Sequence, residues 1–317
     1  KSRPVYELAK KTAAKKNANA AADKKYGVGV SVNIYGCGLD GPDSSEAWAE
    51  LTPTGVAVGN SWEDHGQGAD IGTLTFAHET LKPLNLKPEQ IDLVLNDMTK
   101  TPNSGPAGGS RSNVVTGNAT VVACRNLLEA MKKADGTYRT YDEMVAEGRE
   151  LKYMGKWTAP CTDTPPTDGQ GNPFAAYMYG VCVAEVEVDT KTGKTNVEKM
   201  TLASDVGTII NKLVVDGQMY GGLVQGIGLA LSEDFDDLKK HTTLTGCGIP
   251  KIKDVPDSLD LIYTQHQRPN SLLGASGAGE MPLAAPHAAI INAIYNACGA
   301  RVTHLPARPE KVLAAMA

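Results

Sequence analysis

The chain has 317 residues, of which 41% are hydrophobic and 21% are charged. This composition is typical of a globular protein with one large domain or two ordinary ones. The net charge of −5 gives no reason to expect nucleic acid or an anionic membrane as a partner. No run approaches about 20 apolar residues, so no transmembrane helix is predicted.

The six cysteines are widely and irregularly spaced. None lies in a Cys-x-x-Cys pair, so the chain encodes neither a typical zinc site nor an iron–sulfur cluster. Such spacing favours reduced, mostly buried thiols, and with them a cytoplasmic location. These residues are Cys37, Cys124, Cys161, Cys182, Cys247 and Cys298.

In the first half of the chain, we expect a helix over residues 4–22 and then three strands. The strands cover residues 27–34, 47–51 and 55–58, and the last two form a hairpin. Two helices should follow, separated by residues 101–110, which are too rich in Gly and Pro for regular structure. The predicted apolar faces of these helices are Ile71, Leu74, His78 and Leu81 in the first, and Val121, Cys124, Leu128 and Met131 in the second.

The second half begins beyond a Pro-, Gly- and Thr-rich stretch at residues 155–173. This stretch predicts a boundary between subdomains at residues 1–165 and 166–317. Two long strands are expected at 175–189 and 194–202, followed by helices at about 212–232 and from Pro286. Strands and helices are mixed without a strict βαβ repeat, which favours an α+β fold. No internal sequence repeat is visible.

The predicted helix at 212–232 contains five interior glycines: Gly217, Gly221, Gly222, Gly226 and Gly228. Each costs roughly 1 kcal/mol relative to alanine. We therefore expect close backbone packing, or a ligand, to compensate for them.

Four Gly-rich stretches lead into helices or lie on one: 65–68, 105–112, 217–226 and 274–280. Each on its own is consistent with simple helix capping. Together they suggest a large anionic ligand, because a helix N-terminus with bare backbone N–H groups binds anions. Gln67, Gln218 and Gln225 carry no charge and would donate directed hydrogen bonds to such a ligand.

Glu280 follows a run of small residues and precedes Met281-Pro282. A poorly hydrated carboxylate at this place would be a good general base. The alternative is a helix-end carboxylate that stabilises the dipole of a helix beginning at Pro282 or Pro286. Local sequence leaves both interpretations open.

Six motifs occur in an order that resembles the molybdenum hydroxylase family, the group of xanthine oxidase and aldehyde oxidoreductase. They are Gly66-Gln67-Gly68, Pro102–Ser110, Tyr179–Asp189, Asp205–Gly226, Gly279–Leu283 and Pro309–Leu313. The similarity spans nearly the whole chain and corresponds to the C-terminal, second molybdenum-binding domain, composed of two α/β subdomains. It is strongest toward the bacterial aldehyde oxidoreductases.

The resemblance implies a bound molybdopterin cytosine dinucleotide whose molybdenum has no direct protein ligand. Glu280 would take a proton from a hydroxyl ligand of the metal during oxidation of an aldehyde to a carboxylic acid. The implied cofactor contacts are Gly66, Gln67, Gly68, Ala107, Gly108, Gly109, Ser110, Arg111, Ser112, Gln218, Ser276, Gly277, Ala278 and Gly279. The Gly108 backbone would lie near the oxo ligand of the metal.

The resemblance also implies partners: an aldehyde substrate, a first molybdenum domain, domains that hold [2Fe-2S] clusters, and a second copy in a homodimer. Purine hydroxylases carry a Phe-Thr pair where this chain has Val32-Asn33, which favours an aldehyde over a purine. Two alternatives stay open. One is a split subunit of a hydroxylase for N-heterocycles of the purine or nicotinate type, and the other is a molybdopterin-binding module without catalysis.

Overall fold

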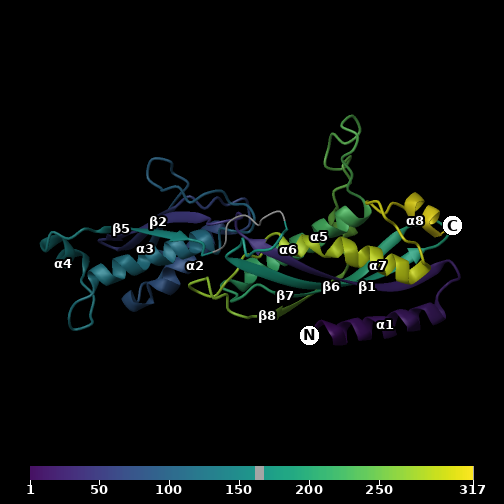
Figure 1. Cartoon of the computed structure of the whole chain (residues 1–317), viewed down its shortest axis with the longest axis horizontal. Coiled ribbons are helices and arrows are strands. Elements are labelled where there is room, and N and C mark those ends of the chain that lie inside the picture. Colours follow the sequence, from purple (N-terminus) through teal and green to yellow (C-terminus); the bar gives the residue numbers. More distant parts are fainter. Residues whose placement is uncertain (161–167, 317) are drawn as a thin grey trace.

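Two hairpins organise the chain into two four-stranded sheets in the computed structural model, which describes residues 1–160 and 168–316. The strand orders are β4-β3-β2-β5 and β1-β6-β7-β8. The sheets and their helices form two lobes along the long axis of an elongated molecule (Figure 1). The strands are β1 (Lys24–Cys37), β2 (Ser44–Thr52), β3 (Gly55–Asn60), β4 (Ile91–Leu95), β5 (Lys152–Thr158), β6 (Ala176–Asp189), β7 (Thr195–Asp205) and β8 (Ser258–Thr264).

The helices cover these sheets and connect them. They are α1 (Ser2–Asn19), α2 (Ala69–Thr80), α3 (Val115–Met131), α4 (Tyr141–Ala146), α5 (Lys212–Leu231), α6 (Met281–Ala284), α7 (Pro286–Cys298) and α8 (Pro309–Met316). Short 3₁₀ turns lie at Lys82–Leu84, Pro88–Gln90 and Ile252–Asp254.

The two sheets share one order of elements, although no sequence repeat predicts it. Each has a hairpin, then a helix, then a strand parallel to the second hairpin strand: β2-β3-α2-β4 and β6-β7-α5-β8. The fourth strand pairs antiparallel with the first hairpin strand, β5 with β2 and β1 with β6. We call residues 44–158 the first lobe, and the elements α1, β1, β6–β8 and α5–α8 the second lobe.

Each lobe has its own apolar core. In the first lobe, α2 and α3 pack on one face of the sheet through residues such as Ala77, Leu127 and Met131. In the second lobe, α5 and α7 cover one face, and α1 lies on the other (Figure 1). Alternation along β1 explains this arrangement, because Gly27 and Gly29 face α7 whereas Val28 packs with Ala9 and Ala13 of α1.

The predicted α+β class is confirmed by these mixed sheets, and most long elements lie where expected. The strands β4, β5 and β8 were missed. The predicted apolar face of α2 is only partly confirmed: Leu81 is buried and Leu74 packs against the core, but Ile71 is 41% exposed. The buried positions within the helix are Ala69, Thr73, Phe76 and Ala77. The reason is tertiary, since Trp62 packs against Gly72 and Phe76 packs against Gly117 of α3.

The prediction for the other first-lobe helix, α3, is largely confirmed. Val121, Cys124 and Met131 are buried, whereas Leu128 is half-buried and Leu127 takes the fully buried position.

The predicted subdomain boundary at 165/166 lies outside the described residues. The pairing of β1 with β6 joins the N-terminal residues to the second lobe, which the predicted division 1–165 does not anticipate. We therefore propose the two lobes as the subdomains, with α1 and β1 belonging to the second.

Three of the five glycines of α5, Gly222, Gly226 and Gly228, are compensated by close packing, as expected, whereas a Cβ on Gly217 or Gly221 would meet no atom within 4 Å. A Cβ on Gly222 would lie 2.4 Å from Pro282, and one on Gly226 would lie 2.6 Å from Pro286. Gly222 and Gly226 thus let α5 approach the prolines in the first turns of α6 and α7. This contact fixes the segment that directly follows Glu280.

Five cysteines in the described part of the chain are free thiols, in agreement with the prediction; Cys161 lies outside that part. None of the helices among the described residues is both long enough and apolar enough to cross a bilayer.

Candidate active site

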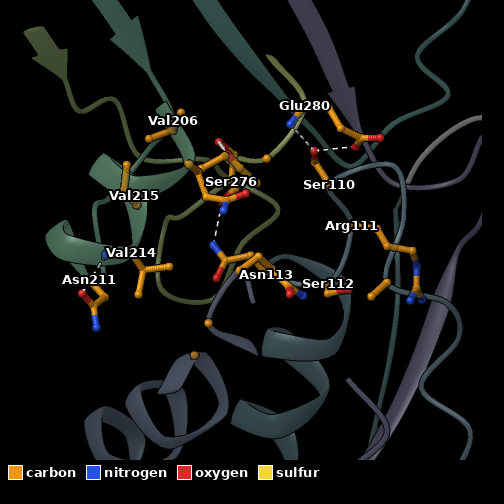
Figure 2. Close-up of a pocket in the computed structure, with 18 of the residues that line it drawn as sticks. Ser110, Arg111, Ser112, Asn113, Val206, Asn211, Val214, Val215, Ser276 and Glu280 are labelled. Carbon is orange, nitrogen blue, oxygen red and sulfur yellow. Dashed lines mark hydrogen bonds between the residues drawn. The ribbon is translucent and has the colours of Figure 1, made fainter. Parts of the chain in front are cut away.

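The loops that leave the two sheets toward each other line a half-open cavity of about 480 Å³. The β3–α2 and β4–α3 loops of the first lobe form one wall. Figure 2 labels Ser110–Asn113 of the β4–α3 loop. The β7–α5 loop, the start of α5 and the β8–α6 loop of the second lobe form the other. All four predicted Gly-rich stretches contribute residues to this cavity, although they are spread over more than 200 positions of the sequence.

Glu280 ends the β8–α6 loop, and its side chain is held by Ser110 from the opposite lobe. The Ser110 hydroxyl donates to Oε2 of Glu280 at 2.7 Å and accepts a hydrogen bond from the Glu280 backbone N–H at 3.0 Å (Figure 2). Glu280 occupies the N-cap position of α6, but its side chain makes no capping hydrogen bond. The geometry therefore favours the carboxylate of a reaction site over the helix-end carboxylate.

The backbone before Glu280 is attached to three other parts of the chain. The Ser276 N–H donates to the Val206 carbonyl at 2.9 Å, and Asn113 donates to the Ser276 carbonyl at 2.6 Å. The Gly277 N–H donates to the buried Cys37 thiol at 3.3 Å. Burial raises the pKa of Cys37 to about 11, so the thiol keeps its proton at neutral pH.

Alternate residues of β1, on the face that packs against α7, contact the segment between Glu280 and α7. Ser31 donates to the Ala285 carbonyl and Asn33 donates to the Met281 carbonyl, each at 2.6 Å. Two residues further along the same face, Tyr35 lies against Glu280. Burial and the negative charge of that carboxylate raise the pKa of Tyr35 to about 12. The phenol therefore stays protonated and can donate a hydrogen bond.

Arg111 does not present its charge to the cavity, contrary to the role that the predicted loop contact suggests. Its side chain is fully buried and bidentate to Asp43, at 2.7 and 2.9 Å. The remaining N–H groups bind the carbonyls of Ser44, Ser104 and Pro106. The guanidinium therefore fastens the β4–α3 loop to the start of β2, and only the backbone of Arg111 remains available to a ligand.

Residues 63–68, the β3–α2 loop, are ordered by their own polar groups. Asp64 accepts hydrogen bonds from the N–H groups of Gly66, Gly68 and Asp70. Gln67 donates to the Glu63 carbonyl at 2.7 Å and accepts from the His65 N–H. Gly66 and Gly68 have φ values of +100° and +86°, which explains the glycines of this motif.

Most of the predicted contact residues line the cavity. Those that do are Gln67, Gly68, Ala107, Gly108, Ser110, Arg111, Ser112, Gln218, Ser276, Gly277, Ala278 and Gly279, together with Glu280. Gly66 and Gly109 do not line it; they serve the turns of their loops.

Several lining residues were not predicted. They are mostly apolar or neutral: Trp62, Phe76, Asn113, Val206, Thr208, Ile210, Asn211, Val214, Val215 and Leu283. The Val206–Asn211 stretch belonged to one of the six motifs, so a signal for it existed. The aromatic residues carried none, because a buried aromatic in a cavity wall resembles a core residue in sequence.

The wall of the cavity suits a large anionic cofactor. A Cβ on Gly108 would meet no atom within 4 Å, so the space beside its backbone is open. Neutral donors line the same cavity, including Gln218 and Asn113, and the lining residue Asn211 caps the N-terminus of the 20-residue helix α5. The size lies within the usual range of about 300–1,000 Å³ for small-molecule sites. The residues present therefore fit a molybdopterin group.

Away from this cavity, the described residues contain one cluster with metal-ligand spacing: Asp234, Asp236 and His241. Asp234 already pairs with Arg308 at 2.9 Å, and Nδ1 of His241 accepts the Asp237 N–H. The expectation that the protein supplies no direct molybdenum ligand stays a prediction.

The positions that pointed away from a purine substrate do not lie in the cavity wall. Val32 is 73% exposed, and Asn33 is hydrogen-bonded to Met281. The substrate inference drawn from this pair therefore has no support from the geometry.

Comparison with known proteins shows the family of the chain. Residues 1–256 match the family model of the molybdopterin cofactor-binding domain. The chain is 55% identical over 316 residues to the aldehyde oxidoreductase of Megalodesulfovibrio gigas, covering 99% of this chain and 34% of that protein. It is 28% identical to the 6-hydroxypseudooxynicotine dehydrogenase complex subunit gamma of Paenarthrobacter nicotinovorans, covering 92% of this chain and 40% of that protein.

The fold of the chain also matches that of a solved structure. The crystal structure of the aldehyde oxidoreductase from Desulfovibrio desulfuricans ATCC 27774 superposes with a TM-score of 0.97 at 61% identity, covering 100% of this chain and 34% of that one. The chain thus spans about a third of the length of these aldehyde oxidoreductases. The order of the motifs, the cavity between the lobes and the family match lead to one conclusion: the chain belongs to the molybdopterin cofactor-binding domain family of the molybdenum hydroxylases.

Proposed function

We propose that this chain is the C-terminal catalytic part of a molybdenum-dependent aldehyde oxidoreductase, with Glu280 as its general base. The overall reaction converts an aldehyde and water into a carboxylic acid, two protons and two electrons. The observation that carries the proposal is the place of Glu280, which is the one carboxylate among the described lining residues of a cavity that fits the cofactor. The 55% identity to an aldehyde oxidoreductase favours the substrate class.

The cofactor, when bound, supplies the oxygen that is transferred and accepts the two electrons. The chain positions it. The Ala107–Ser112 and Ser276–Gly279 backbones would hold the pterin from two sides, and Gln67 and Gln218 would donate to its oxygen or nitrogen acceptors. Glu280 would take up the proton that the reaction releases beside it. Apolar residues such as Phe76 and Val206 would keep bulk water out.

The test is Glu280→Gln in the intact holoenzyme. The amide keeps the size of the side chain but cannot accept a proton, so kcat for aldehyde oxidation should fall by about 10²–10⁴-fold while molybdenum content stays unchanged. Glu185→Gln is a matched control, because Glu185 is half-buried on β6 and does not line the cavity. Unchanged turnover in Glu280→Gln would refute the base.

The form of the cofactor is a further part of the proposal. The resemblance of the motif series to the bacterial aldehyde oxidoreductases supports a cytosine dinucleotide, whose added phosphate the backbone N–H groups of these loops would bind. Acid hydrolysis of the purified holoenzyme and chromatography of the released nucleotide test it. Release of CMP is expected, and release of no nucleotide would contradict the proposal.

The partners are proposed on the same basis. The remaining two-thirds of the relatives' length would supply the first molybdenum domain, the [2Fe-2S] domains and much of the substrate pocket. We also propose a cytoplasmic homodimer. Light scattering on the intact enzyme tests its mass, and a monomer would contradict it.

The N-heterocycle alternative predicts turnover of pyridine or purine substrates in place of benzaldehyde-like ones. Comparing kcat/KM for the two classes decides between them.

A further inference from the structure

The hydroxyl of Ser110 closes a small hydrogen-bonded ring on Glu280. It accepts from the backbone N–H of Glu280 and donates to its carboxylate, at 3.0 and 2.7 Å. Because both ends of the same residue are bound, the ring restricts the side-chain torsions of Glu280. One oxygen, Oε2, receives the serine proton, so the carboxylate has a defined orientation.

The backbone of Ser110 is held in an unfavourable conformation to make this contact. Its φ is +53°, a region that residues other than glycine seldom occupy. Such strain persists only where neighbouring contacts enforce it. Here the following residue, Arg111, is anchored by Asp43, and the preceding residue, Gly109, accepts the Gly38 N–H at 3.0 Å.

The two loops also touch directly beside this ring. A Cβ on Gly277 would lie 2.2 Å from the Ser110 carbonyl oxygen. Glycine at 277 is therefore required for the β8–α6 loop to come close enough for the hydroxyl to reach Glu280. Strain at Ser110, anchoring at Arg111 and the missing Cβ at Gly277 all serve the same contact.

We infer that Ser110 is a positioning residue for Glu280, and not the cofactor ligand that its loop suggests. This inference rests on the proposed function, in which Glu280 is the base. The first lobe thereby sets the orientation of a catalytic group that belongs to the second lobe. Tyr35 lies against the same carboxylate from β1 and stays protonated, so it restrains Glu280 from another side.

The experiment is a double-mutant cycle in the intact holoenzyme with Ser110→Ala, Glu280→Gln and the double variant. Ser110→Ala should lower kcat by about ten- to a hundredfold with KM and molybdenum content unchanged, because a misoriented base acts poorly on bound substrate. In the Glu280→Gln background the serine change should cause little further loss, since the two act as a unit. The unfolding midpoints of the same variants should also be non-additive, which is a readout independent of turnover.

Ser204→Ala is the matched control, because Ser204 is buried and its hydroxyl has no hydrogen-bond partner. Its effects should add to those of Glu280→Gln. Ser110→Gly guards against misfolding: glycine adopts φ +53° without strain, so this variant should be at least as stable as Ser110→Ala and equally slow.

Additive losses in the cycle, or loss of molybdenum from Ser110→Ala, would overturn the positioning role alone. Normal turnover by Glu280→Gln would overturn the base and, with it, the positioning.

Discussion

Two loops line the same cavity and are held in opposite ways. Residues 63–68 of the first lobe are fixed by side chains no more than six positions away, chiefly Asp64 and Gln67. Residues 276–280 of the second lobe are fixed by groups 163, 170 and 240 positions away, namely Asn113, Ser110 and Cys37. The first loop can therefore loosen by itself, whereas the second can move only if contacts with other parts of the fold break.

The difference matches what each loop is proposed to do. A general base needs a fixed position within a fraction of an ångström, and side chains on rigid surroundings provide it. A loop that closes on a large cofactor needs to adapt as the cofactor enters. The comparison therefore predicts that disturbing the long-range contacts of residues 276–280 and their partners affects the whole molecule, whereas disturbing the local contacts of residues 63–68 affects that loop alone.

The largest effect should come from Arg111→Met. This change removes the charge that neutralises Asp43, which is 4% exposed, and leaves a buried carboxylate unpaired. The loss should be about 3–5 kcal/mol of unfolding free energy, measured by denaturant titration. It should also release the loop that carries Ser110 and so reduce turnover.

Arg149→Met is the matched control for this change, because Arg149 pairs with Glu147 on the surface. Exposed pairs contribute about 0–1 kcal/mol. An equal effect of the two substitutions would show that the Arg111–Asp43 pair does not anchor the loop.

A smaller loss should follow Gly277→Ala. The new methyl group would overlap the Ser110 carbonyl, which is backbone and cannot rotate away, so one loop must shift at a cost of about 1–3 kcal/mol. Gly279→Ala provides the comparison within the same loop. Its Cβ would meet only the side-chain ends of Gln218 and Ser110, at 3.3 and 3.5 Å. Thermal unfolding of both variants should therefore show the larger decrease for position 277; the reverse order would break the argument.

The same contrast explains what sequence alone could predict. Locally held features were visible in the sequence: the glycines of residues 63–68, the glycines of α5 and the small residues before Glu280 each leave a pattern over a few positions.

The contact between Ser110 and Glu280 leaves no such local pattern, because its two residues lie 170 positions apart. The pairing of the Arg111 side chain with Asp43 leaves no local pattern for the same reason, since the two residues lie 68 positions apart. The strands β4 and β8 lie at sheet edges and are short, so their patterns are weak. The shared order of elements in the two lobes was hidden because β1, the strand equivalent to β5, precedes its lobe in the chain.

The smallest effect on the structure should come from acidification to below about pH 4, which distinguishes the two loops without a mutation. Partial burial acts to raise the pKa of Asp64, but hydrogen bonds from the N–H groups of Asp70, Gly66 and Gly68 outweigh it and place the pKa below its usual value. A lowered pKa means that the charged form supports the folded loop. Its contribution is complete above the usual pKa of about 3.9 and is lost as the pH falls through the folded-state value.

The amides of Gly66, Gly68 and Asp70 should therefore lose hydrogen-exchange protection below about pH 4, after correction for the intrinsic rate. Two amides in the other loop donate to groups that do not titrate there: Ser276 donates to a carbonyl and Gly277 donates to a thiol. Their protection should persist, and Asp64→Ala should abolish the difference between neutral and acid pH in residues 63–68. Equal loss of protection in both loops would mean that acid opens the contact between the lobes, and that the two loops are not held independently.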